Sequence, residues 1–331
     1  MIKHLICLVL MAAVLGLNSC AKPLPNTTWD TNKLIDSLVD ENPKARIKAR
    51  GILLERGSRA SKVLVNYMQD EDVEMRKACV MLLGDIGHKK SAVPLSMALN
   101  DESDEVFKAA QDAIMKIGDN AVDEYIAVFN NAATKKGLTE AAFALILIGE
   151  QSAEPIINVL IGKNDTASAR MADALKEVGA PAVDLLAPLL GHKKERMRDG
   201  TAYAFILIGD PALEALINAL ESNKIRTRRT AVYALGEIKD PQTIPYLVNR
   251  LEDTDWTTMA WSSLALAKFG KQALDPLLAA LNSRKASMRL GAAYALGELR
   301  DRRAIPALKK KLRDPDSDVR KTAKLALEKL Q

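Results

Sequence analysis

One short string returns at a nearly constant interval along this 331-residue chain. Two clear copies are AVYALGEIKDPQTIPYLVNRLEDTD, from Ala231, and AAYALGELRDRRAIPALKKKLRDPD, from Ala292. The residue that follows the ALGEI string, called the landmark below, lies 30 or 31 residues from the next landmark throughout. The landmarks are Gly57, Gly87, Gly118, Gly149, Gly179, Gly209, Lys239, Gly270, Arg300 and Gln331. A fixed period of this length predicts an array of similar units that pack against their neighbours.

Each unit is predicted to contain two helices. Counted back from the landmark, apolar residues recur at −12, −8, −5, −4 and −1, which places them on one helical face. Glycine at the landmark suits a left-handed turn, whereas Lys239 and Arg300 would cost about 1 kcal/mol there, so we expect those two turns to close differently. Four prolines lie six residues past a landmark and predict the first turn of the second helix. They are Pro155, Pro245, Pro276 and Pro306.

A helix pair of this kind cannot bury its apolar face alone, but stacked pairs can. The strings VRKTAKLAL, AVYALGEIKDPQTIPYL and AAYALGELRDRRAIPAL resemble the HEAT-repeat solenoids, in particular the short HEAT-like repeats of the phycobilin-lyase type. The resemblance spans residues 30–331 and implies an all-α, right-handed α-solenoid of about ten two-helix repeats of 30–31 residues. It is specific for fold and says little about function, because many unrelated proteins share such repeats.

Residues 1–29 do not fit the repeat. A basic start with Lys3 precedes the apolar run LICLVLMAAVLGL, which has the length of a signal-peptide core and is shorter than the roughly 20 residues of a spanning helix. The string LNSC, ending at Cys20, resembles the bacterial lipobox. The resemblance implies a signal peptide over 1–19 that is cleaved, lipid on Cys20, and a proline-containing tether over 20–29. A plain cleaved signal and an uncleaved anchor remain alternatives.

This interpretation places the protein in the bacterial cell envelope, anchored by lipid. Ala21 follows the cysteine, and in a Gram-negative cell this residue would favour the outer membrane. Two or more acyl chains hold a protein stably on a bilayer, at about 0.8 kcal/mol per buried methylene. The remaining cysteine of the mature chain, Cys79, lies in an apolar helical stretch and is expected to be a buried free thiol.

The sequence contains no pattern that indicates catalysis, a metal site or a cofactor. His88 and His192 lie in GHKK strings of different repeats, and neither has a Cys or His at metal-ligand spacing. Some HEAT-like hydroxylases hold two irons with paired His-Glu motifs, but this chain has no His-Glu dipeptide. We therefore predict no catalytic residue, no metal ligand and no cofactor.

Aromatic and arginine side chains gather on the exposed face of the helix that precedes the landmark. The resemblance implies that this helix lines the concave side of the solenoid. Such side chains are typical of interaction hot spots, although aromatic rings at a helix flank can also pack between repeats. The candidate partner-binding residues are Phe143, Tyr203, Tyr233, Trp261, Tyr294, Arg196, Arg226 and Arg229.

A second arginine column lies at position −11. Its members are Arg46, Arg76, Arg198, Arg228, Arg289 and Arg320. These residues could form a ladder that binds anions, or they could bond the Asp-rich turns of their own or neighbouring repeats. The family resemblance favours the structural interpretation.

The sequence thus predicts an envelope lipoprotein that acts as a protein-binding scaffold or assembly factor through the concave face. Its expected partners are a protein or peptide of the envelope and the membrane, through lipid on Cys20, and not nucleic acid. Two alternatives remain open. One is an enzyme or cofactor-handling protein of the HEAT-like lyase or hydroxylase type, and the other is a structural spacer.

Overall fold

The computed structural model describes residues 23–131 and 134–331, and every regular element in these ranges is helical. The chain forms two compact units, one ending at Ile117 and one running from Gly118 to Gln331. The predicted signal peptide and Cys20 lie outside the described residues, so the lipid anchor stays a prediction. Within the described ranges, no helix has the length and apolarity needed to cross a membrane.

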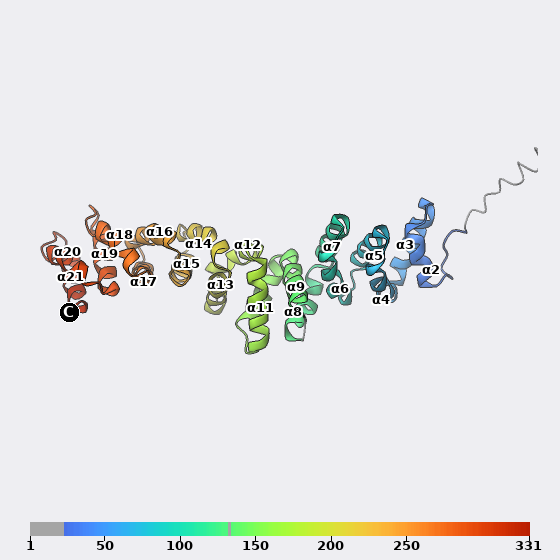
Figure 1. Cartoon of the computed structure of the whole chain (residues 1–331), viewed down its shortest axis with the longest axis horizontal. Coiled ribbons are helices and arrows are strands. Elements are labelled where there is room, and N and C mark those ends of the chain that lie inside the picture. Colours follow the sequence, from blue (N-terminus) through green and yellow to red (C-terminus); the bar gives the residue numbers. More distant parts are fainter. Residues whose placement is uncertain (1–22, 132–133) are drawn as a thin grey trace, which may run out of the picture. The chain divides into compact units, whose positions relative to one another are not determined.

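Ten helices, called the landmark helices, lead up to the ten predicted landmarks (Figure 1). They are α3 (Pro43–Arg56), α5 (Val73–Ile86), α7 (Asp104–Ile117), α9 (Lys135–Ile148), α11 (Asp165–Val178), α13 (Glu195–Ile208), α15 (Ile225–Ile238), α17 (Trp256–Ala267), α19 (Ala286–Leu299) and α21 (Ser317–Lys329).

A companion helix precedes each landmark helix. The companions are α2 (Thr31–Asp36), α4 (Ser58–Leu64), α6 (Ala92–Met97), α8 (Val122–Asn130), α10 (Glu150–Leu160), α12 (Ala180–Leu186), α14 (Leu213–Leu220), α16 (Ile244–Asn249), α18 (Lys271–Ala280) and α20 (Ile305–Lys311). Short 3₁₀ turns extend most companions, namely 37–39, 65–69, 89–91, 98–100, 118–121, 187–191, 210–212, 241–243, 250–252 and 302–304.

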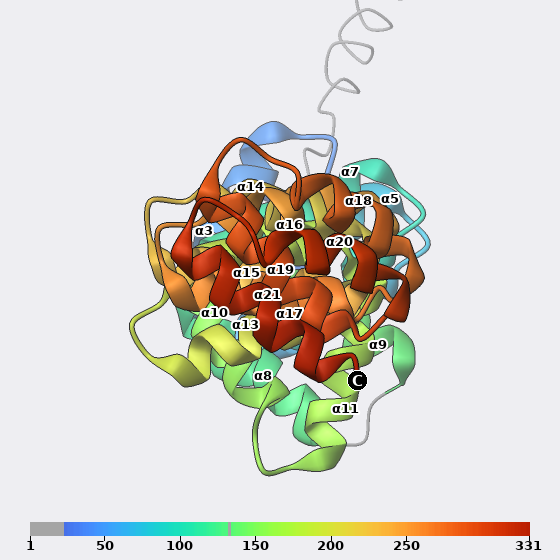
Figure 2. The ribbon, with the colours of Figure 1, turned by 90° about the vertical axis from the view of Figure 1, so that its left-hand side faces the viewer.

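From α13 to α21 the two kinds of helix form two layers. Figure 2 looks along the stack and shows α14, α16, α18 and α20 on one side and α13, α15, α17, α19 and α21 on the other. The predicted core positions −5 and −4 lie between the layers, for example Ala234 and Leu235, which are fully buried. The predicted all-α solenoid of two-helix repeats is confirmed.

Nine of the ten landmarks, all but the last, Gln331, have positive φ, including two that lack glycine. Lys239 and Arg300 have φ of 60° and 54°. Both have ψ near 30°, in the left-handed region that a side chain tolerates. In contrast, Gly209 has φ 75° and ψ −129°, and it directly caps the next helical turn. Gly87, with φ 66° and ψ 21°, closes in the same way as Lys239 and Arg300. The expectation that these two turns close differently is therefore wrong for φ, and for ψ it holds against Gly209 but not against Gly87.

The four prolines that lie six residues past a landmark do not occupy the same position in their helices. Pro245 and Pro306 lie in the first turn of α16 and α20, as predicted. Pro155 and Pro276 lie inside α10 and α18, so the prediction is wrong for these two residues. The physical reason is that α10 and α18 begin directly after Gly149 and Gly270, so a proline six residues past the landmark lies in the middle of the helix.

Some neighbouring landmark helices approach closely through small residues. A Cβ atom added to Gly84 of α5 would lie 2.6 Å from the Cα and Cβ atoms of Ala113 in α7. Gly236 of α15 faces Ala265 of α17 in the same way, with the added Cβ 2.7 Å from the alanine Cβ. Because real Cβ atoms do not approach this closely, these glycines set the spacing of their helices.

Candidate functional site

An open groove of about 460 Å³ crosses three consecutive landmark helices of the unit that starts at Gly118. Residues three or four apart on a helix share one face, and this spacing brings the lining side chains together. The groove, as the term is used below, is lined by Glu195, Arg198, Asp199, Ala202 and Tyr203 of α13, by Arg226, Arg229, Thr230 and Tyr233 of α15, and by Trp261 of α17.

The aromatic part of the groove is held in place and yet open to solvent. Tyr233 and Trp261 pack edge to face, with ring centroids 6.4 Å apart and an interplanar angle of 62°. The ammonium group of Lys268 lies 5.8 Å from the centroid of the Tyr233 ring. Tyr203 and Tyr233 are each 44% exposed and Trp261 is 40% exposed. The rings therefore leave faces free for a ligand, which aromatic side chains buried between repeats would not do.

Arg229 is fixed by a carboxylate of the next repeat. Its Nε and Nη2 atoms donate to the two carboxylate oxygens of Asp255, at 2.9 and 2.8 Å. Asp255 also caps α17, because it accepts hydrogen bonds from the backbone N–H and the hydroxyl of Thr258. The hydrogen bond from Arg229 is the main cause that holds the pKa of Asp255 well below its usual range. This pair gives the groove a rigid wall.

Three other charged groups that line the groove lack such partners. Among residues 23–131 and 134–331, none forms an ion pair with Glu195, Asp199 or Arg226. Partial desolvation, and then the neighbouring Glu195 carboxylate, raise the pKa of Asp199 against the opposing effect of Arg198. The α13 side of the groove therefore presents two unpaired carboxylates together with Arg198, which donates to backbone carbonyls. The α15 side presents one unpaired guanidinium group, that of Arg226.

The groove contains five of the eight candidate partner-binding residues, namely Tyr203, Tyr233, Trp261, Arg226 and Arg229. Tyr294 instead belongs to a second aromatic pair with Trp256, with ring centroids 6.0 Å apart. Phe143 and Arg196 are not among the residues that line the groove. Arg196 is exposed, and its Nη2 atom donates to the Ile161 carbonyl at 3.4 Å.

Sequence reasoning missed Trp256 and the carboxylates of the groove. Trp256 is 59% exposed and is the first residue of α17. Glu195 holds the same position, 14 residues before the landmark, at the start of α13. The prediction rested on aromatic and arginine side chains later in the helix, so it did not include this position. Asp199 lies at position −10, one turn after Glu195 on the same helix.

The arginine column at −11 bonds to the protein itself. Each of the six arginines donates from Nη1 to a backbone carbonyl six residues earlier, in the loop before its own helix. Three of them also donate hydrogen bonds from Nε and Nη2 to a carboxylate of the following repeat. These clamps are Arg76–Asp101, Arg228–Asp253 and Arg289–Asp314.

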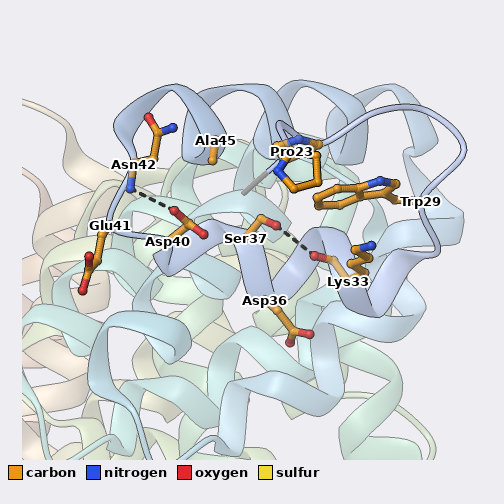
Figure 3. A pocket seen from close by; sticks show the side chains of 10 residues that line it. Pro23, Trp29, Lys33, Asp36, Ser37, Asp40, Glu41, Asn42 and Ala45 are labelled. Carbon is orange, nitrogen blue, oxygen red and sulfur yellow. Dashed lines mark hydrogen bonds between the residues drawn. The ribbon is translucent and has the colours of Figure 1, made fainter. Parts of the chain in front are cut away.

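A second hollow, of about 470 Å³, lies near the start of the described chain, on α2 and α3 (Figure 3). Pro23 and Trp29 belong to the segment predicted as a tether and lie over these helices. Arg56 donates to the backbone carbonyl of Thr27 at 3.1 Å, and the Lys33 ammonium lies 4.1 Å from a ring centroid of Trp29. The described part of the expected tether, residues 23–29, thus packs on the first repeat.

Other reactive groups are few in the described part of the chain. Cys79 is buried, as predicted, and burial raises the pKa of its thiol to about 12, which keeps it protonated. No group of three or more His, Cys, Asp or Glu side chains in residues 23–131 and 134–331 is arranged to hold a metal ion.

A family model described as HEAT repeats matches residues 31–115, 213–287 and 274–331. No curated protein shows significant similarity to the chain. Many solved structures are significantly similar to the chain, although the sequence identity is low. The crystal structure of Kap121p is 13% identical, with a TM-score of 0.34 over 98% of this chain and 42% of that one.

Two other structures, one bacterial and one human, are matched over nearly their whole length. YibA of E. coli is 19% identical, with a TM-score of 0.30 over 92% of this chain and 93% of that one. Human deoxyhypusine hydroxylase in complex with glycerol is 19% identical, with a TM-score of 0.25 over 91% and 95%. By contrast, the chain spans only 50% of the matched Kap95p structure and 42% of Kap121p.

Proposed function

Given that the chain belongs to the HEAT-repeat proteins, we propose that it is a scaffold that binds a protein or peptide segment in the groove across α13, α15 and α17. The observation that supports this most strongly is the cluster of Tyr203, Tyr233 and Trp261. Exposing three rings in one hollow is unfavourable for an isolated protein, since each ring leaves apolar area in water. A partner that covers them would recover this free energy.

The rest of the groove also suits protein recognition. Arg229 is held by Asp255, so it presents its free edge without losing side-chain entropy on binding. Aromatic and arginine side chains are the residue types that dominate binding energy in protein interfaces. The mixture of both charge signs with apolar surface favours a polypeptide ligand over a purely anionic one.

The proposal is tested by crosslinking and affinity capture from native membranes. The variant Tyr203→Ala/Tyr233→Ala/Trp261→Ala is expected to lose a protein that the wild type captures, because rings of this kind each contribute about 2 kcal/mol or more in a hot spot. The matched control is Tyr246→Ala/Trp256→Ala, which removes exposed rings outside the groove and should capture normally. Identical partners for wild type and triple variant would contradict the proposal.

Two other outcomes would favour the alternative functions. Stoichiometric iron or a coloured ligand in the purified protein would replace the scaffold with an enzyme or a cofactor-handling protein. If groove variants behave as wild type in cells while deletion of one whole repeat does not, the chain is a structural spacer. Both measurements are independent of partner capture.

We further propose that the scaffold is anchored in the bacterial envelope by lipid on Cys20 and is not an enzyme. The string LNSC behind a short apolar run supports the anchor. Replacing Cys20 with serine is expected to abolish labelling by radioactive fatty acid and to release the protein from the membrane fraction, because the acyl chains supply the membrane affinity. Unchanged labelling and membrane association of Cys20→Ser would refute the anchor.

A further inference from the structure

The segment that joins the proposed lipid anchor to the solenoid is fixed to the first repeat over its described part. Pro25 is buried, and Trp29 lies against α2 and α3 (Figure 3). The Nη2 atom of Arg56, at the end of α3, donates to the backbone carbonyls of Thr27 and Trp29. Residues 23–29 therefore belong to the folded body of the first repeat.

This packing limits how far the first repeat can lie from a membrane that holds the anchor. Only Ala21 and Lys22 separate Cys20 from Pro23. Because one residue spans at most about 3.6 Å, the Cα atoms of Cys20 and Pro23 lie no more than about 11 Å apart. With acyl chains on Cys20 in a bilayer, part of the surface of the first repeat must lie at the lipid headgroups or close to them.

The surface of α3 has the charge that anionic headgroups attract. The helix contains five basic residues and one acidic residue, the largest excess of positive charge in any of the ten landmark helices. Its one acidic residue lies in the last turn. In the ranges 23–131 and 134–331, no residue forms an ion pair with Lys44, Arg46 or Lys48. Arg50, by contrast, pairs with Asp85 of α5.

Exposed apolar side chains lie among these cations. Ile47 is 73% exposed, the highest fraction of any large hydrophobic side chain in the described part of the chain. Leu54, seven residues further on and therefore on the same helical face, is also exposed. Lys44 and Lys48 lie one turn apart beside Ile47. Exposed apolar residues flanked by lysine and arginine are typical of helices that lie in the interface of a bilayer.

The acidic residues near the proposed anchor come mainly from another part of the first repeat. Asp36 ends α2, and Asp40 and Glu41 lie in the turn that leads from α2 to α3 (Figure 3). An anionic bilayer repels these carboxylates and attracts the cations of α3. The charges therefore favour an orientation in which α3, and not α2, faces the bilayer.

On the basis of the lipid anchor proposed above, we propose that the exposed side of α3 docks on the anionic phospholipid headgroups of the membrane that holds the anchor. The cations pair with lipid phosphates, and the apolar side chains enter the interface. Because the anchor holds the surface next to the headgroups, a contact that is weak by itself forms readily. This surface is called the α3 patch and consists of Lys44, Arg46, Ile47, Lys48 and Leu54.

The test uses the full mature lipoprotein, inserted through its own acyl chains into vesicles of phosphatidylcholine alone or mixed with anionic phosphatidylglycerol. The variant Ile47→Cys carries the polarity-sensitive fluorophore NBD. Cys79 does not react, because its thiol is buried and protonated. NBD emission at position 47 is expected to shift to the blue only when phosphatidylglycerol is present. NBD on Met115→Cys, an exposed position on α7 of the same unit, should show no shift.

Neutralising the α3 patch should release it from the bilayer while the anchor stays in place. Each basic side chain near an anionic surface favours binding by about fivefold, so Lys44→Gln/Lys48→Gln is expected to lower the ratio of docked to undocked protein about 30-fold. Glutamine preserves helix propensity. The matched control Lys309→Gln/Lys310→Gln removes the same charge from exposed positions of α20 and should leave the NBD signal at position 47 unchanged. High salt should also abolish the shift.

Several results would overturn the inference. One is an equal NBD signal on vesicles with and without phosphatidylglycerol, and another is an equal shift at positions 47 and 115. A third is a shift that Lys44→Gln/Lys48→Gln leaves unchanged. A response to a soluble polyanion on neutral vesicles, without a response to phosphatidylglycerol, would also contradict docking on lipid and would point to an anionic wall polymer.

The inference and the proposed anchor fail in different ways. If the purified protein carries lipid and inserts into vesicles while the label at position 47 stays in water, the anchor stands and the docking surface is wrong. If the protein carries no lipid on Cys20 and does not insert, both are wrong. Neither result depends on the groove, whose binding function is tested by partner capture.

Discussion

Replacing Arg289 with alanine is expected to lower the free energy of unfolding by about 3 kcal/mol, because it leaves a buried carboxylate with one longer ion pair, to the Lys311 ammonium at 3.6 Å. The side chain of Asp314 is only 2% exposed, and it accepts hydrogen bonds from Nε and Nη2 of Arg289 at 2.9 and 2.7 Å. The Nη1 atom of Arg289 also satisfies the carbonyls of Ser283 and Arg284. Urea unfolding of the wild type and the variant measures the difference.

The same arginine column provides a matched control. Arg320 is exposed and donates only to the backbone carbonyls of Asp314 and Pro315. Water can replace those hydrogen bonds, so Arg320→Ala should cost about 1 kcal/mol. Equal losses for Arg289→Ala and Arg320→Ala would contradict the assignment of the Arg289–Asp314 pair as a buried clamp.

The clamp also predicts the pH dependence of this difference. The hydrogen bond from Arg289 is the main cause that lowers the pKa of Asp314. A carboxyl group with a lowered pKa in the folded state contributes stability above its unfolded pKa of about 3.9, and this contribution is lost as the pH falls through the folded value. The gap between wild type and Arg289→Ala should therefore be largest near neutral pH and shrink below about pH 4.

Replacing Gly84 with valine is expected to cost about 3 kcal/mol, because α5 and α7 would have to move apart. A Cβ atom at this position would lie 2.6 Å from both the Cα and the Cβ atom of Ala113, and a backbone atom cannot move aside as a flexible side chain can. Valine has a slightly better helix propensity than glycine, so any loss must come from the helix contact. Thermal unfolding of the two proteins gives the effect.

Gly51→Val is the matched control, since Gly51 also lies in the middle of a landmark helix, α3. A Cβ atom added there meets nothing within 4 Å, and the position is exposed. This variant should be neutral or slightly stabilising. If both variants lose the same stability, the loss reflects valine in a helix and the close approach of α5 and α7 is not its cause.

The sequence predicts the array well because its signals are local and repeated. The landmark spacing predicts ten landmark helices, and the apolar positions predict the buried side, as at Ala234 and Leu235. Features that depend on where one repeat meets the next are harder to predict. The Asp314 partner of Arg289 lies 25 residues away, and the proline column shifts at Pro155 because the preceding turn is shorter.

The candidate site, too, could be predicted from the sequence only in part. Helical spacing alone brings Tyr203, Tyr233 and Trp261 to one face, and the structure adds that they share a single groove. Which arginine is engaged could not be predicted, because Arg226 and Arg229 are alike in sequence and only Arg229 reaches a carboxylate of the next repeat. A tyrosine six residues before the landmark does not always line the groove either, since Tyr294 packs with Trp256 outside it.

The most direct test of the central claim is site-specific photo-crosslinking in living cells. The photoreactive residue p-benzoylphenylalanine replaces Tyr203 in the groove or Tyr246 on α16, two tyrosines that are each 44% exposed. A scaffold that binds in the groove predicts a discrete crosslinked protein for the Tyr203 position and none for the Tyr246 position. The same crosslinks at both positions, or a crosslink at Tyr246 alone, would contradict binding in the groove.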